Sequence, residues 1–272
     1  MQYQNPLPDE SVNYSKEHPL KEFAQLLIGV GVVIFIAIAT LNFFAGKLAH
    51  YIPFEYEKSM VKNVGYLTPK LTDKQQELQA LADRLSVHME MPLDMQITLH
   101  HDTGETVNAF ATLGGHVVFF DGLMNKLNTE QQLAAVMAHE IAHVKLRHPI
   151  VATGKGVTLA TLAAFFSGSS ASGAGDWLIG NTINFQMMQY SRDQELAADE
   201  WAARALYREY GDVSGAKSLF EVFSQIETAS LNNKFSVELM RSHPYSKNRW
   251  AALEKIAAQE AWPIQSSDKP PE

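Results

Sequence analysis

The chain has 272 residues and a formal net charge of −8, and it contains no cysteine. The acidic balance and the lack of a basic tract argue against nucleic acid as a partner. Without cysteine there can be no disulfide, thiolate metal site or cysteine nucleophile, so a bound metal must be held by His, Asp and Glu.

The N-terminal part predicts a tail followed by a membrane anchor. Residues 1–22 are mostly polar, and Phe23 to Gly46 contains no charged residue. At about 1.5 Å per residue, that stretch is long enough to cross a hydrocarbon core of about 30 Å. It is too long for a signal-peptide core, and no A-x-A cleavage site follows it. We therefore expect a retained transmembrane helix at residues 23–46 in a lipid bilayer; the alternative is a buried core helix.

Residues 47–70 are interpreted as a juxtamembrane connector. Tyr51, Phe54 and Tyr56 are aromatic residues of the kind that lie at membrane interfaces. Lysines flank the apolar stretch on both sides, and long domains cross membranes largely regardless of charge. The charges therefore do not fix the orientation of the chain.

The catalytic domain is predicted over residues 71–262, beginning with an amphipathic helix from Leu71 to Met89 with Thr72 as its N-cap. Short strand patterns separated by glycines follow, at Gln96–His100, Thr106–Thr112 and Val117–Phe120. Strands and helices do not alternate regularly, so the pattern indicates an α+β fold, mainly helical, with a small antiparallel sheet.

The segment Thr129 to His148 predicts the helix around which the domain is organised. Thr129 and Gln132 form the pattern of a capping box. The helix carries His139, Glu140 and His143 in the pattern H-E-x-x-H. Residues four apart share a helix face, so both imidazoles can bind one zinc ion. Glu140 is rotated by about 100° from His139, which is suitable for a general base rather than a ligand.

The segment from Gly156 to Ser191 has one charged residue, Asp176. We interpret it as a helical hairpin packed on the core, with a membrane-touching or site-covering lid as the alternative. Further helices are expected at Asp193–Tyr210, Val213–Ser230 and Tyr245–Glu260, before a disordered tail at residues 263–272.

A third zinc ligand is predicted downstream, because catalytic zinc commonly has three protein ligands and one open position. Glu195 and Asp199 stand four apart on one helix face. We expect Glu195 to be the ligand and Asp199 to orient a ligand imidazole. The alternative is that both are ordinary solvated carboxylates.

Together these motifs resemble the HtpX and CAAX prenyl endopeptidase family of membrane-associated zinc metallopeptidases. HEIAHVKLRH is followed by ELAAD, and NAFA, GGHVVFFDGL and SHPYSKNR occur in matching order between about Leu71 and Ala258. The resemblance implies a zincin-like fold with one Zn²⁺ per chain held by His139, His143 and Glu195, and Glu140 as the base. Unlike the multi-spanning members, this chain has one convincing span, which points to the members associated with protein quality control.

Two further groups are candidates for the site. Asn108, Ala109, Phe110 and Ala111 are expected to form a sheet edge that binds an extended substrate; a plain internal strand is the alternative. His243 precedes Pro244 and is a candidate oxyanion stabiliser or fourth zinc ligand, with a turn histidine as the alternative. Arg249 is expected to pair with a carboxylate or an oxyanion, structural pairing being the commoner role.

The other histidines near these motifs receive no chemical role. His100 and His101 are adjacent in a predicted strand and point to opposite faces, so they cannot chelate together. His148 is interpreted as a helix-end histidine favoured by the helix dipole rather than as a ligand. His116 lies beside a strand.

The predicted function is a membrane-anchored zinc metalloendopeptidase that hydrolyses unfolded or misassembled polypeptides. A membrane-tethered zinc-containing binding module or chaperone, or a latent and self-inhibited protease, is the alternative. The resemblance favours a bacterial inner membrane with the catalytic domain on the periplasmic side. The oligomeric state is left open.

Overall fold

The computed structural model describes residues 19–49, 51–62, 67, 72–154, 190–232, 243 and 247–264. The chain divides into two compact units, Met1–Phe44 and Ala45–Glu272. Most of the predicted hairpin at Gly156–Ser191, and both predicted tails apart from residues 19–22 and 263–264, lie outside the described residues.

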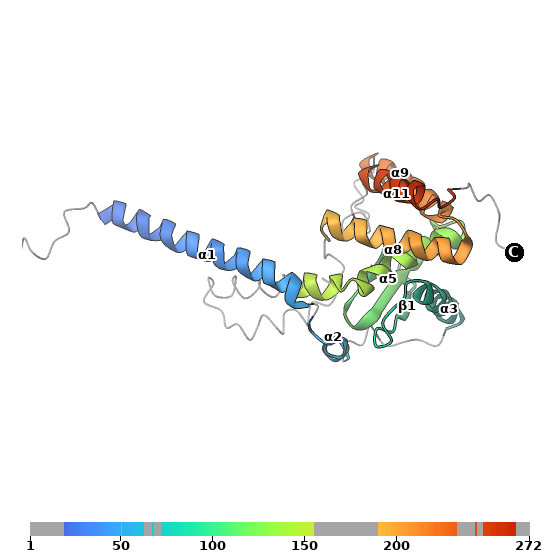
Figure 1. The fold of residues 1–272 in the computed structure, drawn as a ribbon, viewed down its shortest axis with the longest axis horizontal. Helices are drawn as coiled ribbons and strands as arrows, with labels where there is room; N and C mark the ends of the chain where they lie inside the picture. The colour runs from blue at the N-terminus through green and yellow to red at the C-terminus, as the bar shows by residue number, and fades with distance from the viewer. Residues whose placement is uncertain are drawn as a thin grey trace, which may run out of the picture. The chain divides into compact units, whose positions relative to one another are not determined.

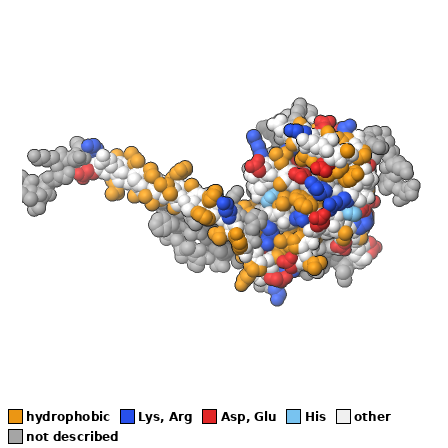
Figure 2. Space-filling model, in the orientation of Figure 1, with side chains coloured by type: hydrophobic (Ala, Val, Ile, Leu, Met, Phe, Trp, Pro, Cys, Tyr) orange, Lys and Arg blue, Asp and Glu red, His pale blue; other side chains and the backbone are white. Residues whose placement is uncertain are grey.

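Helix α1, Pro19–Ala49, contains the predicted membrane anchor. Its stretch Leu20–Thr40 has a mean hydropathy of 2.5 and is not buried against other residues. Hydrophobic side chains cover its surface (Figure 2). In the described part of the chain, it is the only helix long and apolar enough to cross a membrane. The prediction of a helix with these properties is confirmed.

The second unit is mainly helical and contains a small sheet (Figure 1). Its elements in chain order are α2 Phe54–Val61, α3 Asp73–His88, β1 Thr98–Asp102, β2 Ala109–Ala111, the 3-10 turn η3 Leu113–Gly115, β3 His116–Phe120, α4 Asp121–Met124, α5 Glu130–Lys145, α8 Arg192–Tyr210, α9 Ser214–Asn232 and α11 Lys247–Gln259.

The sheet has the strand order β1-β3-β2 and is mixed. Strand β2 is antiparallel to β3, as predicted, but β1 is parallel to β3, so the prediction of a wholly antiparallel sheet was wrong. The reason is the path of the chain. It leaves β1 at one edge, forms β2 at the other edge, and turns back through Gly114 and Gly115, whose φ angles are 72° and 82°. Strand β3 therefore enters the middle of the sheet against β2 and alongside β1.

Helix α5 lies at the centre of the unit. Thr129 caps it by accepting a hydrogen bond from the Gln132 N–H at 3.2 Å. The Gln132 side chain accepts from the Asn128 N–H at 2.7 Å, so the reciprocal bond forms one residue earlier than in a capping box. Every residue from Ala134 to Val144 is buried, because α5 packs against α3, α8, α9 and β2. The helix predicted at Thr129–His148 is therefore a core helix over most of its length.

The sheet separates two groups of buried apolar side chains. Val117 and Phe119 face the larger group, shared with α3, α5 and α8, whereas Val118 and Phe120 face a smaller group. Phe54 of α2 is 2% exposed and belongs to the larger group. Its predicted place at a membrane interface was therefore wrong, while Tyr51 and Tyr56 are 82% and 61% exposed.

Candidate metal centre

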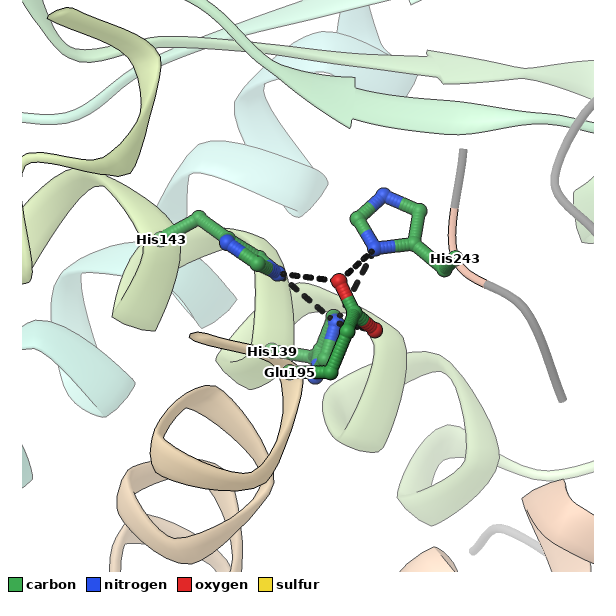
Figure 3. Close-up of side chains that lie close together, drawn as sticks. All are labelled: His139, His143, Glu195 and His243. Atoms are coloured by element: carbon green, nitrogen blue, oxygen red, sulfur yellow. Dashed lines mark hydrogen bonds and ion pairs between the residues drawn. The ribbon is translucent and has the colours of Figure 1, made fainter. Parts of the chain in front are cut away.

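The structure brings the predicted ligands together. His139 and His143 project from α5, and Glu195 projects from the first turn of α8 (Figure 3). The Nε2 atoms of the two histidines are 2.9 Å apart. The Glu195 carboxylate lies 3.5 Å from His139 Nε2 and 3.4 Å from His143 Nε2. Glu195 is 2% exposed, so it is not an ordinary solvated carboxylate.

His243 completes the group. Its Nδ1 atom lies 3.0 Å from Glu195 Oε1 and 3.2 Å from His139 Nε2. One donor atom from each of His139, His143, Glu195 and His243 lies within 4.8 Å of all the others. His243 is 3% exposed and faces the ligand group, which disfavours a plain turn histidine.

The donor set fits zinc. Zinc binds imidazole nitrogen and carboxylate oxygen at about 2.0–2.2 Å in tetrahedral geometry, which places neighbouring donors about 3.3 Å apart. The distances between the His139, His143 and Glu195 donors, 2.9 to 3.5 Å, bracket that value. No rearrangement of α5 or α8 is needed to bring these atoms around one ion.

A buried network orients His139. Its Nδ1 atom lies 3.0 Å from Asp199 Oδ1, one turn beyond Glu195 on α8. Arg249 of α11 binds Asp199 in bidentate fashion, at 2.8 and 2.7 Å, and lies 2.7 Å from Glu195 Oε2. The Asp199 carboxylate is thus fixed by Arg249 and can hold the His139 proton on Nδ1, leaving Nε2 free to bind a metal.

Two neighbours of His143 were not predicted. His148 Nδ1 lies 2.8 Å from His143 Nδ1, and the ring of Tyr190 stacks on the His143 ring at a centroid distance of 4.0 Å. His148 follows the end of α5, and Tyr190 immediately precedes the N-cap of α8, Ser191. Helical spacing alone places His148 on another side of the helix. The signal that was available is its position directly after the motif helix.

Glu140 has one engaged and one available oxygen. Its Oε2 atom accepts a hydrogen bond from the Ala111 N–H of β2 at 2.8 Å. Its Oε1 atom is buried and accepts no hydrogen bond from the residues that the structure describes; the Nε2 atom of His243 is 3.4 Å away. Because Glu140 is 1% exposed, burial raises the pKa of its carboxyl group, which favours proton uptake.

The two ligand imidazoles have opposite electrostatic environments. Burial lowers the pKa of His143 well below its ordinary value, so this ring is neutral. Burial also disfavours the charged form of His139, but hydrogen bonds to Asp199 and Glu195 outweigh it and raise the pKa to about 10. Burial by itself raises the pKa of Glu195, but the surrounding imidazoles hold it well below its usual range. Glu195 is therefore ionised, and His139 must release a proton on binding a metal.

The predicted substrate strand lies beside the site. Hydrogen bonds from Thr112 N to His116 O and from Phe120 N to Asn108 O show that Asn108 and Thr112 face β3. The backbone groups of Ala109 and Ala111 therefore face the free side of β2, where Ala111 meets Glu140. The side chains of residues 108–111 are nonetheless buried, with exposures of 0 to 5%.

The space next to Glu140 is small. A cavity of about 30 Å³ lies between α5, α8 and α9 and reaches His139, Glu140 and His243. That volume holds one or two water molecules. A larger cavity of about 310 Å³ lies elsewhere, between α3 and the start of α5, and none of the metal-centre residues line it.

Comparison with known proteins identifies the family. The model of peptidase family M48 matches residues 72–257, which include α5, α8 and α11. The chain belongs to peptidase family M48. Members of this family are zinc metallopeptidases, so the chain is a zinc metalloprotease whose buried His and Glu side chains are suited to the metal.

Relatives extend the comparison. Metalloprotease LoiP of Escherichia coli is 26% identical over 193 residues, covering 67% of this chain and 70% of that protein. The mitochondrial metalloendopeptidase OMA1 of Schizosaccharomyces pombe is 29% identical over 163 residues, covering 60% of this chain and 47% of that protein. The beta-barrel assembly-enhancing protease of E. coli is 29% identical over 170 residues, covering 57% of this chain and 33% of that protein. The match thus spans less than half of the last two.

Proposed function

We propose that this M48 peptidase is a membrane-anchored endopeptidase in which His139, His143 and Glu195 hold one zinc ion and Glu140 is the general base. The observation that carries the proposal is the convergence of these donors around one point, beside a carboxylate whose Oε1 atom has no hydrogen-bond donor among the described residues. Helix α1 is the proposed anchor, as its length and apolar surface suit a bilayer.

The chemistry follows from the arrangement of the side chains. When bound, zinc supplies the Lewis acid that polarises the scissile carbonyl and acidifies the attacking water. Glu140 accepts the proton of that water at Oε1 and passes it to the leaving amine. The Ala111 N–H holds the other carboxylate oxygen, so the base keeps one orientation while the proton moves. Asp199 and Arg249 keep the His139 ring directed at the metal.

The proposed substrate is an extended polypeptide segment. Asn108 to Ala111 lie at the edge of the sheet, and the outward backbone groups of Ala109 and the carbonyl of Ala111 can pair with a substrate strand. Main-chain pairing tolerates many sequences, which suits unfolded or misassembled proteins. Since residues 108–111 are buried, the groups that cover this edge must move aside before a substrate can pair with it.

A role in protein quality control near a membrane is consistent with the relatives, one of which is named for enhancing beta-barrel assembly. We propose the periplasmic side of a bacterial inner membrane for the catalytic unit. Reporter fusions at the C-terminus decide the side: activity of a reporter that works only in the cytoplasm would contradict this placement.

Replacing the proposed base tests the mechanism. Glu140→Gln keeps the shape of the side chain and its bond to Ala111 but cannot accept the proton at Oε1. We expect it to bind zinc like the parent and to lose casein cleavage by at least about 100-fold, the range of general-base catalysis. Zinc is measured by metal analysis of the purified protein, and the parent treated with a chelator is the inactive control. Undiminished cleavage by the variant would show that another group is the base.

His243 is proposed to act as a fourth donor in the substrate-free protein, because its Nδ1 atom lies within the ligand group. Such a donor competes with the water and substrate for the open zinc position. His243→Ala is then expected to keep zinc and to cleave casein faster than the parent. A loss of cleavage with zinc retained would instead assign His243 to stabilising the oxyanion.

A binding module without turnover is the weaker candidate. A binding module does not need a general base. Glu140 has the arrangement of one: its buried carboxylate accepts a hydrogen bond at Oε2 and accepts none from the described residues at Oε1. Chelator-sensitive cleavage of casein would exclude it.

A further inference from the structure

The second ring nitrogen of each ligand histidine has a different kind of partner. His139 Nδ1 faces the carboxylate of Asp199 at 3.0 Å, which is a common partner of a zinc-bound imidazole. His143 Nδ1 faces another imidazole, His148 Nδ1, at 2.8 Å. His143 is 0% exposed and His148 is 7% exposed, so solvent does not substitute for this contact.

The geometry determines which atom carries the proton. A neutral imidazole donates from one nitrogen and accepts at the other. For His143 to offer Nε2 to a metal, its proton must be on Nδ1, from which it donates to His148 Nδ1. His148 must then keep its Nδ1 lone pair free of a proton. The stacked ring of Tyr190, at an interplanar angle of 20°, covers one face of His143 and restricts its rotation.

The backbone after α5 explains how His148 reaches this position. In a continuous helix, a residue five positions after His143 is rotated by about 140° away from it. Helix α5 instead ends at Lys145, and Arg147 adopts a left-handed conformation with φ of 59°. This conformation is uncommon for a residue with a side chain, because the Cβ atom approaches the following carbonyl oxygen too closely. It turns the chain so that the His148 ring meets the His143 ring, at a centroid distance of 4.9 Å.

The left-handed turn is held by contacts to α2 and to the residues just before it. Arg147 Nη2 donates to the Ile52 carbonyl at 2.7 Å and pairs with Glu57 Oε1 of α2 at 2.5 Å. Both Arg147 and Glu57 are buried, at 6% and 2% exposure. A buried arginine needs such partners, so the ion pair restricts Arg147 to this conformation.

We propose that His148 is a positioning residue for the metal centre: its Nδ1 atom accepts a hydrogen bond from the Nδ1–H of His143 and so fixes the tautomer that presents Nε2 to zinc. The left-handed turn at Arg147, held by Glu57 and the Ile52 carbonyl, places it there. The inference rests on the proposed role of His143 as a zinc ligand and adds the residues that prepare it.

Two substitutions separate hydrogen bonding from packing. His148→Leu fills much of the buried space but removes the acceptor, whereas His148→Asn packs less well but places a carbonyl oxygen near the position of Nδ1. We expect His148→Leu to bind zinc about 10–100-fold more weakly than the parent, the usual effect of losing such a partner, and His148→Asn to retain most of the affinity. Zinc affinity is measured on the full-length protein in detergent by competition with a chromogenic chelator.

His101 supplies the matched control. Its side chain is 13% exposed and is bonded to Asp121 at 2.8 Å, outside the metal centre. His101→Leu and His101→Asn are expected to bind zinc like the parent. Equal zinc affinity of His148→Leu and the parent, or an equal loss in both His148 variants, would overturn the proposal.

A second measurement uses the parent protein and therefore does not depend on the folding of any variant. In the zinc-loaded parent, nitrogen NMR of the histidine side chains is expected to show the His143 proton on Nδ1, with scalar coupling across the hydrogen bond to His148 Nδ1. A His143 proton on Nε2, or no coupling to His148, contradicts the proposal. If the parent binds no zinc, the proposed function itself fails; if it binds zinc but these tests fail, only the role of His148 is wrong.

Discussion

At the scale of single residues, the contacts of each imidazole decide its chemistry. His100 lies on the sheet face that also carries its register partner Val118, and its Nε2 atom is 2.8 Å from Nδ1 of His116. His100 is 4% exposed. Burial, together with the neighbouring His116, lowers the pKa of His100 to about 4. The folded protein therefore keeps this ring neutral at pH values where the unfolded chain protonates it.

This depressed pKa predicts a loss of stability in weak acid. Above about pH 6.5 His100 is neutral in both states and its pKa has no effect. As the pH falls from 6.5 to about 4, the unfolded state takes up a proton that the folded state excludes, so the stability contributed by the neutral ring is lost. The size is about 2–3 kcal/mol.

The variant His100→Gln tests this sign, because glutamine can still bond to His116 but does not titrate. We expect its free energy of unfolding to fall by about 2–3 kcal/mol less than that of the parent between pH 7 and pH 4. His101→Gln, one residue along the strand, controls for the loss of a histidine. If the free energy of unfolding falls equally with pH in His100→Gln and in the parent, His100 is not the group responsible.

The sequence predicted those site residues whose positions follow from helical spacing. His139, Glu140 and His143 are on one helix, and Glu195 and Asp199 are one turn apart on another. The structure brings Glu195 to the two histidines and places Asp199 beside His139. His148 and Tyr190 could not be found this way. The contact of His148 depends on the left-handed conformation of Arg147, and that of Tyr190 on the packing of a residue distant in the chain. Neither leaves a periodic signal.

At the scale of elements, α2 differs most from what the sequence predicts. Residues 47–70 are interpreted from the sequence as a juxtamembrane connector, but α2 packs into the folded unit. Phe54 lies in the larger apolar core, and Glu57 pairs with Arg147 and accepts the Gly114 N–H at 3.2 Å. Helix α2 thus contacts both the segment just after α5 and the turn that leads from β2 to β3.

Truncation measures this contribution. A protein that begins at residue 50 keeps α2, and one that begins at residue 71 lacks it. The shorter form leaves Arg147 without its partner, at a cost of about 3–5 kcal/mol, and exposes the space filled by Phe54. We expect the longer form to unfold at a clearly higher temperature and to retain zinc better.

Phe54→Ala in the longer form separates the loss of packing from the loss of the ion pair. The contribution of α2 is refuted if the two truncated proteins have equal unfolding temperatures. The predicted domain boundary at residues 70 and 71 stays a prediction that the same experiment tests.

The sheet shows what element-level patterns leave open. Short strand patterns separated by glycines predicted the strands, which the structure places at Thr98–Asp102, Ala109–Ala111 and His116–Phe120, within a few residues of the predicted ranges. They did not predict that β3 lies between β1 and β2. That order depends on Gly115, where an added Cβ would lie 2.2 Å from the Gln96 carbonyl oxygen. Close backbone approach of this kind is a tertiary contact that a local pattern does not encode.

At the scale of the whole molecule, composition and motif order predicted a mainly helical peptidase unit and an apolar N-terminal helix, and the structure has both. The family match begins at residue 72, whereas the apolar core of the same unit includes Phe54. The folded unit is therefore larger than the region by which the family is recognised. In this protein, residues ahead of the family match contribute to the core, and a buried ion pair joins them to the segment that follows the motif helix.

The hydrogen bond from Ala111 to Glu140 links the strand proposed to bind substrate with the residue proposed as the general base. If the proposed substrate pairs with β2, it has to leave the Ala111 N–H unpaired, because that donor already orients the carboxylate of Glu140, the proposed base. A chain aligned one residue out of step would compete for it and misdirect the proton acceptor. The Glu140 carboxylate would then lose its orientation, and the misaligned polypeptide would not be cleaved. Alignment of the substrate and orientation of the proposed base would thus depend on the same hydrogen-bond donor.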